Sequence, residues 1–215
     1  MSKEIVIENT RRFVKEKLEN EGSGHDWYHI ERVYNLARYL CREEGGNSYI
    51  IELAALLHDI EDWKFSKANK SDTSIIEEFL LSEKVEMEDI KKVISIIKTL
   101  SFKGGVVSSK QDTIEGMIVQ DADRLDAMGA IGIARTFTYG GYKGNLIYDP
   151  TIEPMDFKSL DEVKNKKNHT INHFYEKLLK LKDLINTRKG KELAGKRHRI
   201  MEQFLDDFIE EWNFK

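Results

Sequence analysis

The chain has 215 residues but only two prolines, Pro150 and Pro154, and both lie in one short segment. Proline interrupts the interior of a helix because it lacks an amide proton and clashes with the preceding turn. Most of the remaining sequence is rich in Leu, Ile, Lys and Glu, which are favourable or tolerable in helices. The sequence therefore predicts an all-α fold.

Length and charge define the broad class of protein. A chain of 215 residues lies on the upper side of the single-domain range, so we expect one domain over residues 1–215. Hydrophobic residues make up 40% of the chain, which is enough for a core. The 38 acidic residues outnumber the 34 basic ones, so the chain lacks the positive excess of a dedicated nucleic-acid-binding protein. We therefore expect no nucleic-acid partner.

The cysteine content and the hydropathy pattern indicate a compartment. With Cys41 as the single cysteine, no intrachain disulfide can form, which fits a reducing environment. The N-terminal segment is charged throughout, and no stretch approaches the roughly 18 consecutive apolar residues of a membrane span. We expect a cytoplasmic protein with no membrane partner.

Apolar residues recur at helical spacing along most of the chain. Asp26 is a suitable N-cap for one of the expected helices, and residues 50–57 are apolar on almost every side, as in a helix at the centre of a core. Segment 140–158 is the longest expected loop, and loops of this length in compact domains are often functional. The expected helices span residues 3–20, 26–45, 48–57, 71–81, 87–100, 111–139 (bent near residue 129 or 132), 160–186 and 190–212.

The strongest local signal is LLHDI at 56–60, where His58 and Asp59 stand side by side after this apolar helix. Burying an ionised carboxylate without a partner is very costly. A divalent metal ion would remove that cost, because imidazole and carboxylate are good ligands for Mn, Fe, Co, Ni or Zn. The alternative is a helix end that emerges into water, and the dipeptide by itself favours this alternative.

Two further segments change that balance. In GHDWYHIERV at 24–33, His25 and His29 are four residues apart, and His29 shares a helix face with Arg32. In QDADRLDAMGAIGIAR at 120–135, three aspartates interrupt an apolar helical pattern, which is unexpected unless they line a site. Each segment also has a simpler interpretation: the histidines could lie on the surface at a helix start, and Asp121 and Asp126 could be solvated.

Together, HIERV, ALLHDI and DADRLDA resemble the H…HD…D signature of the HD-domain phosphohydrolase superfamily. The resemblance implies an HD-domain helical bundle with a metal pocket between helices. It implies that His29, His58, Asp59 and Asp123 bind one divalent metal ion. Mn²⁺ is the ion that the resemblance favours, whereas the donor types also admit Mg²⁺, Fe²⁺, Co²⁺ and Ni²⁺.

The resemblance extends over nearly the whole chain to a subgroup of small bacterial proteins that act on nucleotides. It is carried by HDWYH, HDIEDWKF, DADRLDAMGAIGIARTFTYGG, NLIYDP, INHFYEKLLKLKD and KRHRIMEQFLDDF. It implies a small phosphorylated substrate, a nucleotide, and hydrolysis of a nucleoside triphosphate to the monophosphate and pyrophosphate. Two other functions stay open: a phosphodiesterase or nucleotidase acting on another phosphorylated metabolite, and a metal-stabilised regulatory module that binds nucleotides without turnover. The oligomeric state also stays open.

Several residues near the ligands are candidates for catalysis and substrate binding. Asp62 or Glu61 could act as general base, and we favour Asp62 because EDWKF resembles the subgroup's D-x-K-F pattern. Lys64 and Arg32 could offset the charge of a phosphate, and His25 could contact the substrate or orient a ligand. Alternatively, the acids lie on a solvated turn, the cations form ion pairs and His25 is a loop histidine.

Other candidates lie in the C-terminal half. His169 and His173 form an HxxxH pair, but HTINH lacks the glutamate of the HExxH metalloprotease motif, so we expect no second metal there. The aromatic residues at 137–142 could form a lid that stacks on a base, or could simply pack on the surface. We expect Arg124 to form a structural salt bridge. Four residues of the C-terminal helices could close around a substrate: Tyr175, Lys177, Arg197 and His198.

Overall fold

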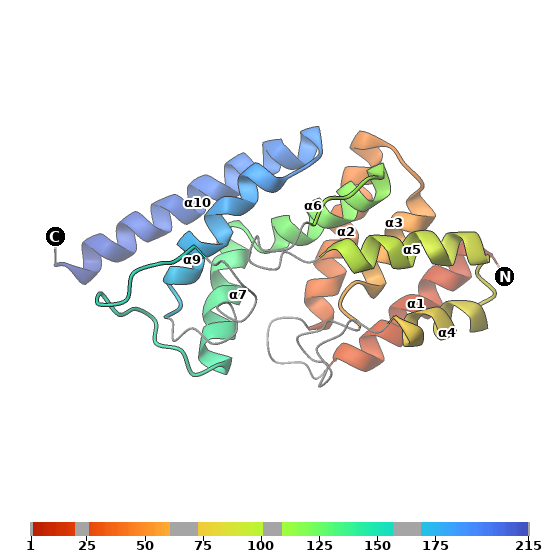
Figure 1. Ribbon diagram of the computed structural model, residues 1–215, viewed down its shortest axis with the longest axis horizontal. Coiled ribbons are helices and arrows are strands. Elements are labelled where there is room, and N and C mark those ends of the chain that lie inside the picture. Colours follow the sequence, from red (N-terminus) through yellow and green to blue (C-terminus); the bar gives the residue numbers. More distant parts are fainter. Residues whose placement is uncertain (1, 20–25, 61–72, 101–108, 157–168, 215) are drawn as a thin grey trace. The chain divides into compact units, whose positions relative to one another are not determined.

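In the computed structural model, the residues described are 2–19, 26–60, 73–100, 109–156 and 169–214. Their regular structure is helical, with no strand within these ranges, so the predicted all-α fold is confirmed (Figure 1). The described residues form two compact units. Unit 1 takes in the residues up to 100 together with 109–122, and unit 2 those from 123 onward. The expectation of one domain over residues 1–215 stays a prediction.

Unit 1 is built around one buried helix. Residues 48–57 form this helix, α3, and eight of its ten residues are buried. It packs against α1, α2 and α5, while α4 packs on α5, so the predicted central helix is confirmed (Figure 1). The helices of unit 1 are α1 (Lys3–Leu18), α2 (Trp27–Glu44), α3 (Ser48–Leu57), α4 (Ser74–Ser82), α5 (Met87–Leu100) and the first part of α6 (Ile114–Asp126).

Side-chain caps fix where α2 and α3 begin. The Asp26 carboxylate accepts a hydrogen bond from the His29 amide at 2.8 Å, which confirms the predicted N-cap. Asn47 does the same for α3 by accepting from the Tyr49 amide at 3.1 Å. The start expected for the fourth helix, at residue 71, lies outside the described residues, and α4 follows Thr73.

Residues 111–139 do not form one bent helix, so that prediction was wrong. Two helices replace it, α6 (Ile114–Asp126) and α7 (Gly129–Tyr142). Gly129 has a φ angle of +69°, a left-handed backbone conformation that residues other than glycine rarely adopt. A Cβ atom on Gly132 would lie 2.2 Å from the Ala127 carbonyl oxygen, so the corner closes too tightly for a larger residue.

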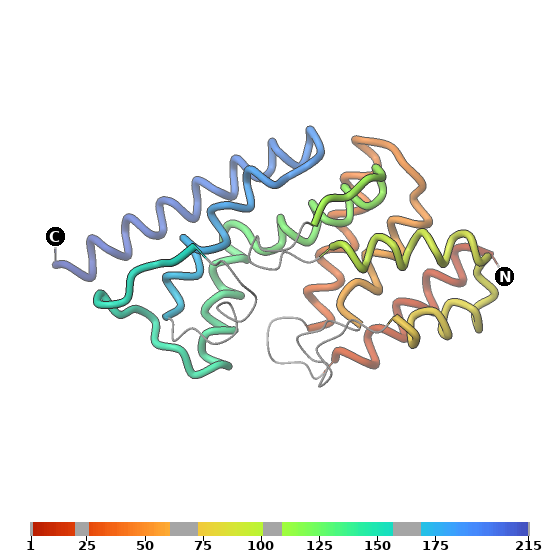
Figure 2. The backbone as a smooth tube through the Cα atoms, viewed as in Figure 1, coloured from red at the N-terminus to blue at the C-terminus, as the bar shows by residue number. Residues whose placement is uncertain are grey.

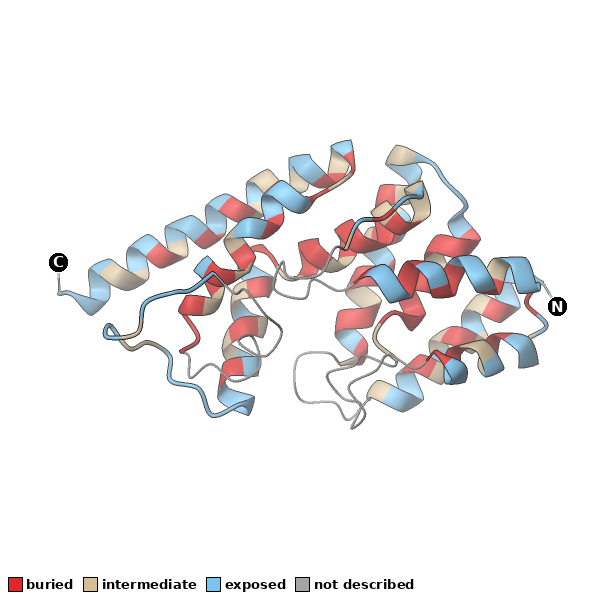
Figure 3. Cartoon of the chain, in the orientation of Figure 1, coloured by how far each residue is buried: buried red, intermediate tan, exposed pale blue. Residues whose placement is uncertain are grey.

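Unit 2 ends in the longest helix, α10 (Arg188–Trp212), which matches the prediction for 190–212. Buried and exposed residues alternate along it (Figure 3). The expected helix at 160–186 is wrong in its described part, which forms a short helix, α9 (Asn172–Glu176), and a 3₁₀ helix, η1 (Leu178–Leu184). The helix breaks at Lys177, whose φ of −136° is far from helical. α10 packs on α7 and η1, and α9 packs on η1.

The non-helical segment 143–156 is the teal stretch that follows α7 in Figure 2. Backbone amides of Thr170 and Ile171 donate to the carbonyls of residues 146 and 147, at 2.8 and 3.1 Å. The Met155 amide donates to the buried carboxylate of Glu176 at 3.0 Å. The amides of Thr170 and Ile171 are thereby taken from the hydrogen bonds that a continuous helix through these residues would need.

None of the helices in the described part of the chain combines the length and the apolar character needed to cross a bilayer.

Candidate metal centre

Three predicted ligands meet in unit 1. His29 lies in the first turn of α2, whose start Asp26 fixes, and His58 and Asp59 directly follow the last residue of α3. The two Nε2 atoms of the histidines are 3.3 Å apart. The Asp59 carboxylate oxygens lie 3.3 Å from His29 Nε2 and 3.6 Å from His58 Nε2. The packing of α2 on α3 therefore gathers two imidazoles and one carboxylate at one point.

A backbone hydrogen bond orients the His58 ring. His58 Nδ1 lies 2.8 Å from the carbonyl oxygen of Ala55. A carbonyl oxygen can only accept, so Nδ1 carries the proton and Nε2 presents its lone pair to the cluster. Histidines that bind metals commonly donate their other ring nitrogen in this way, which fixes the tautomer and the ring orientation.

The separations fit a shared cation. Two donors that each lie about 2.1 Å from one ion are about 3.0–3.4 Å apart when they subtend 90–110° at it. The observed separations of 3.3, 3.3 and 3.6 Å lie close to this range. One donor atom from each of His29, His58 and Asp59 lies within 4.8 Å of the others, so the group can hold a metal ion.

Burial makes a cation favourable at this place. The side chains of His29 and His58 are 0% and 1% exposed, and that of Asp59 is 11% exposed. A carboxylate so far removed from water needs a compensating charge. The mixed nitrogen and oxygen donors suit borderline divalent ions such as Mn²⁺, Fe²⁺, Co²⁺, Ni²⁺ and Zn²⁺.

The fourth predicted ligand, Asp123, lies in the last turn of α6 and is the residue at which unit 2 begins. The group of residues that the structure brings together as possible metal ligands consists of His29, His58 and Asp59. The role of Asp123 as a ligand therefore stays a prediction. Arg32 lies on α2 with intermediate exposure, and its contact with substrate also stays a prediction. Four further predicted residues lie outside the described ranges: His25, Glu61, Asp62 and Lys64.

Two of the three acids of the DADRLDA motif are buried, while Asp123 has intermediate exposure. Asp121 is 0% and Asp126 3% exposed, so the alternative that both are solvated was wrong. Asp126 forms an ion pair with Arg135 of α7 at 3.0 Å. Arg124, for which we expected a structural salt bridge, donates a hydrogen bond to the Leu184 carbonyl.

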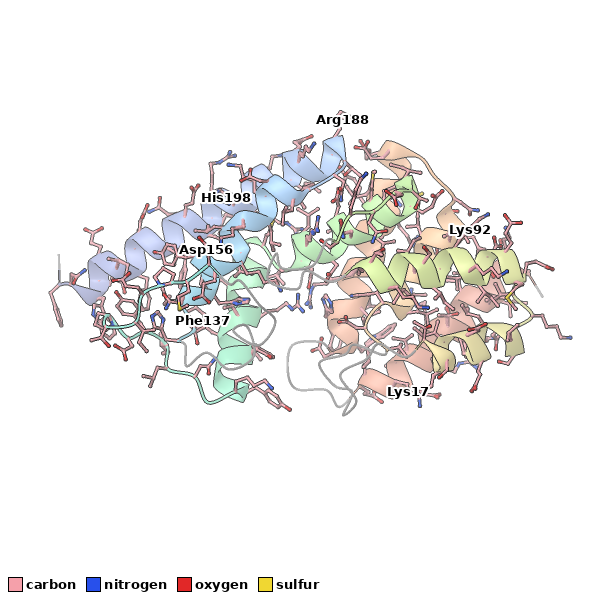
Figure 4. All side chains as sticks on the ribbon, viewed as in Figure 1. Lys17, Lys92, Phe137, Asp156, Arg188 and His198 are labelled. Carbon is pink, nitrogen blue, oxygen red and sulfur yellow. The ribbon has the colours of Figure 1, made fainter. Side chains whose placement is uncertain are left out.

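Two further candidates, His169 and His198, make contacts within unit 2. His169 Nε2 lies 3.1 Å from the Ile152 carbonyl, and its Nδ1 accepts from the Asn172 amide, so both ring nitrogens bond to the backbone. His198, on α10, pairs with Glu202 at 3.3 Å (Figure 4). Burial raises the pKa of the Tyr175 phenol, while nearby Tyr148 and Asp206 act in the same direction.

The predicted lid residues belong to α7. Phe137 contacts the rings of Phe174 and Phe204, at centroid distances of 6.2 and 5.8 Å (Figure 4). Tyr142 is 60% exposed. Phe137 therefore packs inside unit 2, and base stacking by the other aromatic residues stays a prediction.

Sequence reasoning missed two residues that matter to the site and its surroundings. Ala55 accepts the hydrogen bond of His58, and the spacing of three residues before a histidine at a helix end was a usable signal. Arg135 neutralises Asp126, but nothing in the sequence indicates that α7 folds back to bring this pair together.

Comparison with known proteins identifies a family whose sequence pattern includes the residues of this site. The sequence pattern of the HD domain matches residues 26–128, a range that includes His29, His58, Asp59 and Asp123. The chain belongs to the HD-domain family.

Relatives with solved structures extend the similarity over the whole chain. Bacillus subtilis YpgQ is 39% identical over 199 residues, which cover 92% of this chain and 89% of YpgQ. YpgQ in complex with ADP has a TM-score of 0.75 at 37% identity, covering 95% of this chain and 96% of that one. The structure of an HD-superfamily hydrolase from Bacillus thuringiensis is 49% identical in sequence and has a TM-score of 0.77. The structure of a Lactobacillus plantarum protein is 38% identical and has a TM-score of 0.90. Each of these similarities covers 100% of this chain and 100% of the other chain.

Proposed function

We propose that this protein is a divalent-metal-dependent phosphohydrolase that converts a nucleoside triphosphate to the monophosphate and pyrophosphate. The observation that carries the proposal is the buried cluster of His29, His58 and Asp59, with the His58 tautomer fixed by the Ala55 carbonyl. The Bacillus thuringiensis relative is an HD-superfamily hydrolase, which supports hydrolysis. The ADP complex of YpgQ supports a nucleotide as the ligand.

In this proposal His29, His58 and Asp59 bind the cation together with Asp123, which the resemblance of DADRLDA to the final-aspartate motif supports. We favour Mn²⁺, as the resembled subgroup implies. When bound, the cation would polarise a phosphoryl oxygen and offset the negative charge that develops during hydrolysis. Ala55 contributes by holding the His58 ring, so that Nε2 is ready to coordinate without a change of tautomer.

The residues around the ligands complete the chemistry. Asp62 is our choice for the general base that takes a proton from the attacking water, with Glu61 as the alternative. Lys64 and Arg32 would offset the charge of the phosphate groups, and His25 would contact the substrate. These roles rest on the sequence and on its resemblance to the subgroup.

The test is an assay of the purified protein with Mn²⁺ and a panel of nucleoside mono-, di- and triphosphates. Products are separated by ion-exchange chromatography, and pyrophosphate is measured directly. We expect pyrophosphate from at least one triphosphate and none after treatment with a chelator. If Mn²⁺ binds and no compound of the panel releases phosphate or pyrophosphate, hydrolysis of nucleotides is excluded as the function.

A paired substitution tests the general base. Asp62→Asn should lower kcat by about 10²–10⁴-fold, the usual contribution of a positioned acid or base. Asp112→Asn is the matched control, because Asp112 is 82% exposed and lies outside the predicted site. Unchanged turnover in Asp62→Asn would transfer the role to Glu61 or to a residue not considered.

A regulatory module that binds nucleotides without turnover is the second candidate. The ADP complex of YpgQ supports it, because a bound nucleotide is compatible with a sensor as well as with an enzyme. Calorimetric binding of ADP or ATP in the presence of Mn²⁺, with no product after long incubation, would favour the module over the hydrolase.

A further inference from the structure

Side chains from two other helices contact the last turn of α6, which carries Asp123. At a helix C-terminus the last carbonyls lack partners within the helix. Here the Leu125 carbonyl accepts from the Met128 amide at 3.0 Å and also from the Arg197 guanidinium of α10. The Asp123 carbonyl, in the same turn, accepts from the Ala127 amide at 3.3 Å. A cation at this end of a helix is also favoured by the helix dipole.

The position of Arg197 is set by close packing. A Cβ atom on Gly129 would lie 3.1 Å from both Cβ and Cγ of Arg197, so α10 passes directly over the corner between α6 and α7. Burial lowers the pKa of the Arg197 guanidinium, while the negative charge of Asp126 acts in the opposite direction. A half-buried cation held by its stem against a glycine has little freedom to move away from the Leu125 carbonyl.

A second contact neutralises the neighbouring acid. Asp126 follows Asp123 by three residues, so both lie on the same face of α6. Asp126 pairs with Arg135 of α7 at 3.0 Å, and their side chains are 4% and 17% exposed. This pair gives the Asp126 carboxylate a fixed partner, so that it does not compete with Asp123 for a cation.

We propose that Arg197 and Arg135 are positioning residues for Asp123. Arg197 would fix the last turn of α6, and Arg135 would hold the charge of Asp126. The inference rests on the proposed function, in which Asp123 is a metal ligand. It adds that the C-terminal helix α10 controls metal affinity without contributing a ligand.

The experiment measures the dissociation constant of Mn²⁺ by calorimetry, with circular dichroism and melting as controls of folding. Arg197→Met should weaken Mn²⁺ binding about 10-fold or more, the usual effect of losing a residue that orients a ligand. Arg197→Lys should bind Mn²⁺ more tightly than Arg197→Met but less tightly than the parent protein, because lysine keeps the positive charge and lacks the several N–H donors of the guanidinium. Arg199→Met is the matched control, since Arg199 is exposed on the same helix, and should stay within about twofold of the parent protein.

A double substitution separates positioning from a general effect on the fold. If Arg197 acts through Asp123, then Asp123→Asn combined with Arg197→Met should bind Mn²⁺ no more weakly than Asp123→Asn alone. Electron paramagnetic resonance of bound Mn²⁺ should change in Arg197→Met and stay unchanged in Arg199→Met. Fully additive losses in the double variant would show that Arg197 does not act through Asp123, and would overturn the inference.

Arg135 is tested by rescue. Arg135→Met should weaken Mn²⁺ binding, and adding Asp126→Asn should restore it, because an amide no longer competes for the cation. If Arg135→Met binds Mn²⁺ as the parent does, or if Asp126→Asn restores nothing, the role of Arg135 is refuted.

The outcomes distinguish this inference from the proposed function. Normal Mn²⁺ binding by Asp123→Asn would remove Asp123 from the ligand set and with it the proposed four-ligand site. Weak binding by Asp123→Asn with parental binding by folded Arg197→Met would overturn the inference alone. If Arg197→Met does not fold, Arg197→Lys decides: several-fold weaker binding supports the inference, and parental binding overturns it.

Discussion

Replacing His58 by Asn should abolish most metal binding while leaving the fold almost intact. The imidazole makes two separate contacts, through Nδ1 to the Ala55 carbonyl at 2.8 Å and through Nε2 to the cluster, 3.3 Å from His29 Nε2. The amide nitrogen of Asn can take the place of Nδ1, because both atoms are attached to Cγ. Asn has no atom at the position of Nε2, so the substitution removes the ligand and keeps the bond to the backbone.

The effect can be expressed as a melting temperature. An ion that binds the folded state alone, at 100 times its Kd, stabilises it by about 2.7 kcal/mol. In proteins of this length, 1 kcal/mol shifts Tm by about 2–4 °C, so Mn²⁺ should raise the Tm of the parent protein by about 5–11 °C. If His58→Asn weakens binding about 100-fold, the same Mn²⁺ concentration contributes about 0.4 kcal/mol, and the rise falls to about 1–2 °C.

Thermal denaturation followed by circular dichroism, with and without Mn²⁺, measures both quantities. His58→Ala is the informative control, because it also loses the bond to Ala55. Without metal it should melt below His58→Asn by the equivalent of about 1 kcal/mol. His198→Asn, outside the cluster, should keep the full Mn²⁺ response. A folded His58→Asn variant that Mn²⁺ stabilises as much as the parent would refute the assignment of His58 as a ligand.

Three other substitutions test the surrounding structure. Gly129→Ala should lower the free energy of unfolding in urea by about 1–2 kcal/mol or more, because a residue with a side chain is strained at φ +69° and its Cβ would press on Arg197. An unchanged free energy of unfolding would contradict the close packing of α10 on the turn between α6 and α7. Gln120→Ala removes an amide that donates to the backbone carbonyls of Ser109 and Leu100, at 2.6 and 3.2 Å, and should lower the free energy of unfolding by about 1–3 kcal/mol. Burial and the hydrogen bond to Glu52 raise the pKa of Tyr34 from 10.0 to about 12, so its contribution to stability is present below about pH 10 and is lost as pH rises towards 12. Tyr34→Phe should therefore lack the last phenol to ionise in an ultraviolet titration, and a variant in which a phenol still ionises near pH 12 would argue against that assignment.

The sequence predicted helices best where a local signal marks their ends. Asp26 begins α2 through a hydrogen bond within its own turn, and the apolar run of residues 50–57 belongs to a helix buried on nearly every side. Both features depend on neighbours in sequence, so they can be deduced without the fold. A local signal also drew attention to His58 and Asp59 after the buried helix, but their role as ligands was predicted only from the joint resemblance of HIERV, ALLHDI and DADRLDA to the HD-domain signature.

The predictions that were wrong depended on contacts between distant residues. The helix expected over 160–186 is interrupted because the amides of Thr170 and Ile171 bond to carbonyls at 146 and 147. The helix expected over 111–139 ends at Asp126 because Gly129 turns the chain. A glycine within an apolar helical pattern is compatible with either a continuous helix or a corner, and local propensity does not decide between them.

The acids of DADRLDA show how the corner at Gly129 determines chemistry. Asp123 and Asp126 both interrupt an apolar helical pattern, and the resemblance of DADRLDA to the final-aspartate motif assigns the role of ligand to Asp123. The turn at Gly129 lets α7 fold back, and this brings Arg135 to Asp126. The glycine also makes room for α10, so that Arg197 reaches the Leu125 carbonyl. The glycine that ended the predicted helix is therefore the residue on which both guanidinium contacts near Asp123 depend, that of Arg135 with Asp126 and that of Arg197 with the Leu125 carbonyl.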